Sequence, residues 1–139
     1  MSRAELSPGA AGSASIVVGE GDLASVLAVE KGDSFPRVLA TARMIALMEL
    51  AASRALQPLL AEGELSVGTS LDVSHTAATP PGATVTATGT FQRMEGKLYV
   101  FEVVAEDPGG EIGRGLHRRA IVARDRLEAG AAKRVPPRG

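Results

Sequence analysis

The feature that most constrains the fold is a long stretch rich in Ala, Leu and Met that precedes several segments rich in Val and Thr. Over residues 36–60, good helix formers dominate, and apolar residues surround the expected helix almost completely. Pro36 suits a first helical turn, and Gly63 suits the position just after a helix ends. The sequence therefore predicts one long, buried central helix over residues 36–60.

After Gly63 the composition changes to Val, Thr, Ile and Phe, which are typical of strands. Turn signals rich in Pro and Gly separate the predicted strands, which cover residues 64–74, 83–91, 98–105 and 112–123. Short connections favour an antiparallel meander. Residues 14–18 add one more strand, while residues 23–29 are ambiguous. The expected fold class is α+β, with a curved antiparallel sheet of about five strands wrapped around the helix.

At 139 residues the chain fits one domain. We expect that domain over residues 14–127, with a flexible N-terminus (1–13) and a flexible C-terminal tail (128–139). The first residues do not resemble a signal peptide, and no apolar run approaches the ~20 residues that a membrane span needs. A cytoplasmic protein without membrane contact is therefore expected.

The composition also narrows the chemistry. A net charge of −1 and an aromatic content of only 3% argue against a nucleic-acid partner. The absence of cysteine excludes thiolate nucleophiles and cysteine-type zinc sites. With two histidines and no spaced ligand cluster, no metal site is expected. Oxygen and imidazole groups remain as candidates for catalysis.

One glutamate, Glu49, interrupts the apolar run of the predicted helix. Acidic side chains are seldom buried without a partner, so a carboxylate expected in the interior needs an explanation. The plausible partner is His75, which lies where a predicted strand meets a Pro-Gly turn. Thr41 lies two helical turns before Glu49, in the same sector of the helix. A hydroxyl, a carboxylate and an imidazole are suited to acid-base or nucleophilic catalysis.

Structural roles compete with these interpretations. A carboxylate on a buried helix can instead pair with Arg43 or with an arginine on the last strand. A helical Thr often bonds only to the preceding turn. His117 lies two residues before Arg119, hence on the same face of its strand, and is interpreted as structural.

Several stretches resemble the fluoroacetyl-CoA thioesterase type of hot-dog protein, over about residues 35–122. The most specific stretch is the His-Thr-Ala-Ala-Thr-Pro-Pro-Gly run that begins at His75. The other matching stretches are Phe35-Pro36-Arg37-Val38-Leu39-Ala40-Thr41, Leu47-Met48-Glu49, Val67-Gly68-Thr69 and the region 111–120.

The resemblance implies a hot-dog fold and a catalytic set of Thr41, Glu49 and His75. It implies that Gly68 and Arg119 contact the substrate, an acyl thioester, and that CoA is part of this substrate and not a separate cofactor. Hot-dog proteins commonly pair their open sheet edges in a dimer, so a homodimer with its site at the interface is expected.

The division of labour within this set stays open. Glu49 can orient His75 and stabilise its imidazolium, attack the thioester, or polarise a water. Thr41 can attack the carbonyl or position it, and the backbone N–H of Gly68 is a candidate oxyanion donor. Arg119 can pair with a phosphate or a carboxylate.

The leading functional hypothesis is an acyl-CoA thioesterase that hydrolyses a small acyl thioester to free acid and CoA. Phe35 is the only aromatic residue kept from the lid of the fluoroacetyl-selective enzyme, so a fluoroacetyl preference is not expected to transfer. The alternatives are a hot-dog hydrolase or dehydratase acting on carrier-bound acyl chains, and a non-catalytic acyl-CoA-binding protein. The sequence does not decide the acyl group.

Overall fold

The computed structural model describes residue 3 and residues 5–138. Its helices and strands, in chain order, are β1 (Ala11–Val17), α1 (Thr41–Leu56), β2 (Glu64–His75), β3 (Thr84–Glu95), β4 (Leu98–Asp107), β5 (Gly110–Ala123) and α2 (Arg124–Arg134). Short 3-10 turns cover Glu20–Asp22, Ala24–Leu27 and Gln57–Leu59.

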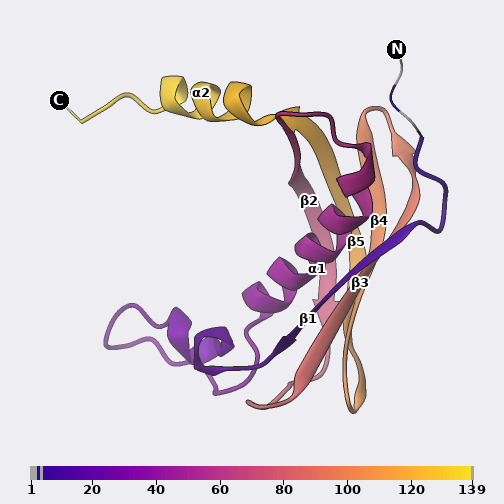
Figure 1. The fold of residues 1–139 in the computed structure, drawn as a ribbon. Helices are drawn as coiled ribbons and strands as arrows, with labels where there is room; N and C mark the ends of the chain where they lie inside the picture. The colour runs from indigo at the N-terminus through magenta and orange to yellow at the C-terminus, as the bar shows by residue number, and fades with distance from the viewer. Residues whose placement is uncertain (1–2, 4, 139) are drawn as a thin grey trace.

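In the described part of the chain the strands form a 5-stranded sheet in the order β1-β3-β4-β5-β2, with antiparallel neighbours throughout. Figure 1 shows this sheet curling around α1, which lies in its concave side. The predicted α+β class and hot-dog layout are confirmed. β2 is an edge strand, so one of its sides has no strand beside it in the single chain.

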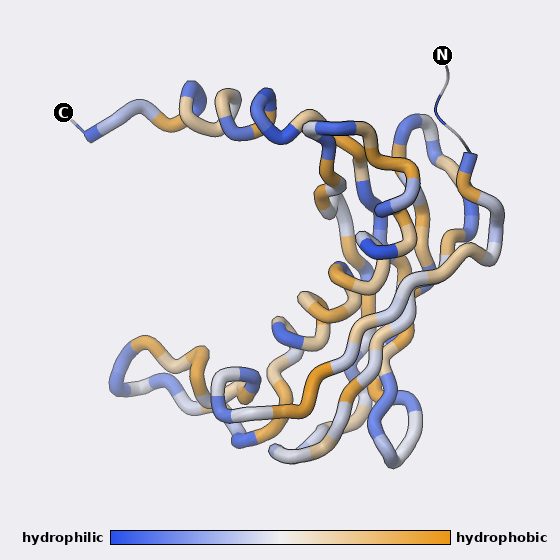
Figure 2. The backbone as a smooth tube through the Cα atoms, in the orientation of Figure 1, coloured by the Kyte–Doolittle hydropathy of each residue, from blue (hydrophilic) through white to orange (hydrophobic). Residues whose placement is uncertain are grey.

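The core lies between α1 and the concave face of the sheet, where apolar residues recur at helical spacing. Figure 2 shows α1 as a mostly apolar segment on the concave side of the sheet. Gly89 on β3 allows close approach, because a Cβ at this position would lie 2.8 Å from the Ala52 Cα. The helix contributes Met44, Leu47, Met48, Ala51, Ala52, Ala55 and Leu56 to the buried core.

The predicted helix is too long at both ends. Residues 36–40 are not helical, because the N–H of Leu39 donates to the Thr79 carbonyl and the N–H of Ala40 donates to the Asp22 carbonyl. These long-range bonds hold the backbone extended until Thr41. At the other end α1 stops at Leu56, because Pro58 cannot continue the helix and a 3-10 turn follows.

Both chain ends also differ from the prediction. β1 begins at Ala11, inside the expected N-terminal segment, and α2 occupies most of the expected tail. No residue of α2 is buried, and Figure 1 shows this helix projecting from the sheet. The segment before α1 projects to the same side, so α1 lies between two arms. The flexibility of either terminus stays a prediction.

Within the described residues, no helix is both long enough and apolar enough to span a membrane.

Candidate active site

Thr41 and His75 meet where α1 begins and β2 ends. Thr41 Oγ1 lies 2.8 Å from His75 Nδ1, which is hydrogen-bond distance. When the hydroxyl donates, the unprotonated imidazole Nδ1 accepts with its lone pair and can take the hydroxyl proton. The other ring nitrogen, Nε2, is buried and has no hydrogen-bond partner within the described part of the chain. The two predicted residues therefore form a hydrogen-bonded pair, whereas their roles as nucleophile and base stay a prediction.

The loop after His75 is fixed from two sides. The Thr76 N–H donates to the Ile112 carbonyl at 2.7 Å, which ties the loop to β5. Thr79 is fully buried, and its hydroxyl donates to Asp107 Oδ2 at 2.7 Å. The Thr79 carbonyl accepts from Leu39 N–H at 2.9 Å. The same loop therefore connects His75 to the segment that leads into Thr41.

A pocket of about 470 Å³ opens beside this pair. Its lining includes Phe35, whose side chain is 46% exposed in the single chain. Apart from the Thr and His side chains the pocket is largely apolar, and it is lined by Ala24, Leu27, Phe35, Pro36, Val38, Leu39, Thr41, Ala42, His75, Thr76, Ala77 and Ala78.

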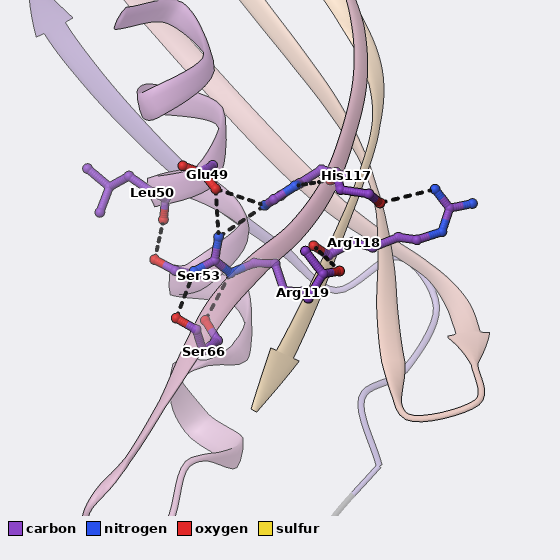
Figure 3. Close-up of polar contacts among 9 residues, drawn as sticks. Glu49, Leu50, Ser53, Ser66, His117, Arg118 and Arg119 are labelled. Atoms are coloured by element: carbon purple, nitrogen blue, oxygen red, sulfur yellow. Dashed lines mark hydrogen bonds and ion pairs between the residues drawn. The ribbon is translucent and has the colours of Figure 1, made fainter. Parts of the chain in front are cut away.

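A second polar cluster surrounds Glu49, further along α1. Figure 3 shows the Glu49 carboxylate facing His117 and Arg119, which both come from β5. Glu49 Oε1 lies 3.7 Å from Arg119 Nη1 and 4.0 Å from His117 Nε2. Arg119 is nearly fully buried, and its Nε and Nη2 donate to the hydroxyl and the carbonyl of Ser66 on β2.

The hydrogen bonds of this cluster fix its protonation states. His117 Nδ1 lies 2.9 Å from the Ser70 carbonyl, which can only accept, so Nδ1 carries a proton. Burial lowers the pKa of His117, and the nearby Arg119 cation lowers it further, against the opposing effects of the Ser70 bond and Glu49. Burial also lowers the pKa of Arg119, while the Glu49 carboxylate raises it. Burial and these contacts therefore favour a neutral imidazole beside the guanidinium cation.

Gly68 on β2 passes next to the same carboxylate. A Cβ at this position would collide with Glu49 Oε1 and would lie 3.0 Å from His117 Cε1. The absence of a side chain therefore makes room for the carboxylate, whereas a substrate contact by Gly68 stays a prediction.

The structure corrects the expected surroundings of Glu49. Its side chain is 40% exposed in the single chain, so it is not the interior carboxylate predicted from the apolar run. No hydrogen bond or ion pair joins Glu49 to His75 among the described residues, and along α1 Glu49 lies about 12 Å from Thr41. The competing interpretation, an ion pair with an arginine on the last strand, describes the single chain correctly.

The structural interpretation of His117 missed its contacts. His117 is fully buried and accepts a hydrogen bond at 3.0 Å from Arg119 Nη1. The sequence did contain a signal for this contact, because His117 and Arg119 are two residues apart and therefore lie on the same face of a strand. The predicted catalytic set thus falls into two places in the single chain: the pair of Thr41 and His75, and the cluster around Glu49.

Comparisons with known proteins agree with this fold. The fluoroacetyl-CoA-specific thioesterase family model matches residues 19–125. A fluoroacetyl-CoA thioesterase from Streptantibioticus cattleyicolor is 45% identical over 102 residues, which cover 73% of each chain. A solved structure of a fluoroacetyl-CoA thioesterase is 37% identical with a TM-score of 0.88, covering 96% of this chain and 100% of that chain.

A hot-dog-like protein from Thermanaerovibrio acidaminovorans is 30% identical with a TM-score of 0.79, covering 94% of each chain. These relatives give no support to a dehydratase or to a non-catalytic binder. The chain therefore belongs to the fluoroacetyl-CoA-specific thioesterase family, and it is a thioester hydrolase with the hot-dog fold.

Proposed function

We propose that the chain hydrolyses a short acyl-CoA thioester to free acid and CoA, with Thr41, Glu49 and His75 as its catalytic residues. The observation that carries the proposal is the 2.8 Å contact between Thr41 and His75 on the wall of an apolar pocket. The volume of about 470 Å³ is at the small end of the range for small-molecule sites. Solved structures of variant relatives hold fluoroacetate or acetyl-CoA, both with two-carbon acyl groups.

In the proposed reaction, Thr41 Oγ1 attacks the thioester carbonyl carbon while its proton passes to His75 Nδ1. The C–S bond then breaks, and His75 returns the proton to the departing CoA sulfur. Water attacks the resulting acyl ester, again losing a proton to His75, and releases the acid. The Thr41 hydroxyl is thereby restored.

Of the three roles left open for Glu49, polarising a water leaves no acyl adduct on the protein, and the other two differ in where the acyl group goes. As an orienting group it accepts from the imidazole and stabilises the imidazolium, and as a nucleophile it forms a mixed anhydride with the acyl group. Rapid quenching followed by peptide mass spectrometry separates these routes, because the acyl adduct lies on Thr41 in the first and on Glu49 in the second.

The enzyme is proposed to act as a homodimer joined through the open edge of β2. Antiparallel pairing of two β2 strands around an axis between Leu71 and Asp72 would set His75 opposite the partner's Gly68. Since the carboxylate of Glu49 lies against Gly68, this arrangement would bring the partner's Glu49 toward the unpartnered His75 Nε2. A carboxylate there would accept the Nε2 proton and fix the tautomer that the Thr41 bond requires.

Exposed apolar side chains also support a dimer interface on the side of the molecule where the two arms project. Leu50 follows Glu49 on α1 and is 42% exposed, and Leu27 and Phe35 are exposed on the arm before α1. On the other arm, an apolar groove of about 660 Å³ lies between the end of β5 and α2 and includes Leu127. Such apolar surface is typical of an interface between copies of a chain.

A substrate panel tests the activity. Free thiol released from acetyl-, fluoroacetyl-, propionyl- and hexanoyl-CoA is measured for wild type and Thr41→Val, which keeps the side-chain shape and removes the hydroxyl. We expect a loss of about a hundredfold or more in kcat/KM. Thr88→Val, a matched change on β3, serves as control. Equal rates for wild type and Thr41→Val contradict the catalytic assignment.

Mixing two inactive variants tests whether each site uses both subunits. Thr41→Ala and Glu49→Gln chains are refolded together, so that heterodimers form. If Glu49 acts across the interface, each heterodimer has one intact site and the mixture regains about a quarter of wild-type activity. If Thr41 and Glu49 of one chain act together, the mixture stays inactive.

Discrimination between fluoroacetyl-CoA and acetyl-CoA is expected to be weak, because Phe35 alone stands before α1 as an aromatic lid residue. The ratio of the two kcat/KM values measures it. The cytoplasmic location expected from the sequence stays a prediction.

A further inference from the structure

His117 takes no part in the reaction outlined above, yet every polar atom of its ring is engaged. Its side chain is fully inaccessible to solvent, and it extends from β5 toward α1. Nδ1 donates to the Ser70 carbonyl at 2.9 Å, so in the neutral ring Nε2 is an acceptor. Arg119 Nη1 lies 3.0 Å from this acceptor. The ring therefore has one defined tautomer.

All three nitrogens of the Arg119 guanidinium donate a hydrogen bond. Nε and Nη2 donate to Ser66, and Nη1 donates to His117. Because a guanidinium is planar and rigid, these bonds together set the direction of its remaining N–H groups. Nη1 is the nitrogen that lies 3.7 Å from Glu49 Oε1. Among the described residues, His117 is the hydrogen-bond acceptor for this nitrogen, and its loss would leave only the two bonds to Ser66 to orient the group.

Apolar neighbours complete the surroundings of the ring. Phe101 on β4 and Leu71 on β2 are its strand partners in register. Glu49 on α1 and Arg119 on β5 are the charged groups that face it in the described residues. A protonated ring would direct a second donor at the guanidinium, so the arrangement requires the neutral form.

We propose that His117 is a positioning residue, which acts as a neutral acceptor that aims Arg119 at Glu49 and so holds this carboxylate for thioester hydrolysis. The inference rests on the proposed catalytic role of Glu49. If His117 only filled the core, losing the hydrogen bond of either ring nitrogen would have the same effect on activity. The proposal instead predicts that loss of the Nε2 acceptor lowers activity more.

Two substitutions of similar size separate the ring nitrogens. The amide of His117→Gln reaches the position of Nε2 and keeps an acceptor for Arg119, but it loses the bond to Ser70. The amide of His117→Asn reaches the position of Nδ1 and keeps the bond to Ser70, but it loses the acceptor. Each variant thus loses one hydrogen bond of the ring.

We expect kcat/KM with the best acyl-CoA to fall roughly ten- to hundredfold for His117→Asn, as for loss of a hydrogen bond to a charged group. His117→Gln should recover most of this loss although its thermal midpoint is no higher. In an Arg119→Lys background, His117→Asn should lower kcat/KM little further, because the guanidinium that His117 positions is already absent. Equal losses for Gln and Asn, or full additivity with Arg119→Lys, would overturn the proposal.

The ring itself gives a readout that does not depend on turnover. Nitrogen NMR of the wild-type protein should show His117 as the neutral form protonated at Nδ1, and this signal should persist in Glu49→Gln. A ring protonated at Nε2 would overturn the inference even in an active enzyme. In contrast, failure of the proposed function appears as thiol release that is no faster for wild type than for Glu49→Gln.

Discussion

The backbone of Gly68 lies directly against the carboxylate of Glu49, so a side chain at this position of the edge strand β2 would displace the Glu49 side chain of the helix α1. The position opposite Gly68 on β5 is Arg119, which faces the same carboxylate. The glycine, the carboxylate and the guanidinium therefore form one packed unit. Any change in this unit is expected to move Glu49 relative to the substrate.

Gly68→Ala should lower kcat/KM more than it lowers stability. The added Cβ would displace the Glu49 side chain, which is flexible and can turn toward solvent, so the fold should lose only about 1–3 kcal/mol. Turnover and urea unfolding are measured for this variant and for Gly21→Ala, where a Cβ meets nothing within 4 Å. Unchanged turnover in Gly68→Ala would show that the position of Glu49 does not matter.

Thr79→Val should weaken the loop that carries His75. The substitution keeps the side-chain shape but leaves Asp107 Oδ2 without its 2.7 Å donor, at a cost of about 1–3 kcal/mol. Because the Thr79 carbonyl also holds the segment before Thr41, kcat should fall as well. Unfolding free energies and kcat are compared with those of Thr79→Ser, which keeps the hydroxyl. Identical unfolding free energies and kcat values for Thr79→Val and Thr79→Ser would show that the hydroxyl does not stabilise the loop.

The strands were predictable because their signals are local: β-branched residues at alternate positions, bounded by turns rich in Pro and Gly. The start of α1 was not, because residues 36–40 favour a helix locally but bond to Asp22 and Thr79, which are distant in sequence. At the other end, Pro58 was a local signal that the helix prediction overlooked.

The partners of Glu49 could not be predicted from local patterns alone. The contact between Thr41 and His75 agrees with the motif resemblance, since both residues lie at element ends that the fold joins. Glu49 faces His117 and Arg119 because of the way the sheet curls around α1. No local sequence pattern encodes this curvature. The proposed homodimer, which would complete the proposed catalytic set, is likewise a matter of surfaces and not of sequence periodicity.

Stability should depend on pH through His117. Burial and Arg119 hold its folded-state pKa below the value of 6.5 that applies in the unfolded chain. Between these two pKa values the unfolded state binds more protons, so stability is complete above about pH 6.5 and falls as the pH drops, by at most about 1.4 kcal/mol per pH unit.

Urea unfolding of wild type and His117→Gln between about pH 5 and 8 isolates this effect, because all other titrating groups are shared. The stability advantage of wild type should shrink as the pH falls below 6.5, the unfolded-state pKa of the histidine. A difference that stays constant across this range would show that His117 binds protons equally in both states.

Deleting α2 should weaken the proposed dimer without unfolding the chain. None of its residues is buried in the single chain, so loss of residues 124–139 should shift the thermal midpoint of a monomeric preparation by only a few degrees. If the groove between β5 and α2 holds a second copy, the dimer dissociation constant should rise about tenfold or more. Sedimentation velocity over a concentration series measures this constant.

Leu127→Ser, which changes the groove lining, should raise the dimer dissociation constant in the same way. Glu128→Ser, an exposed change on the same helix, should leave it unchanged. Equal dissociation constants for all these chains would show that α2 takes no part in pairing.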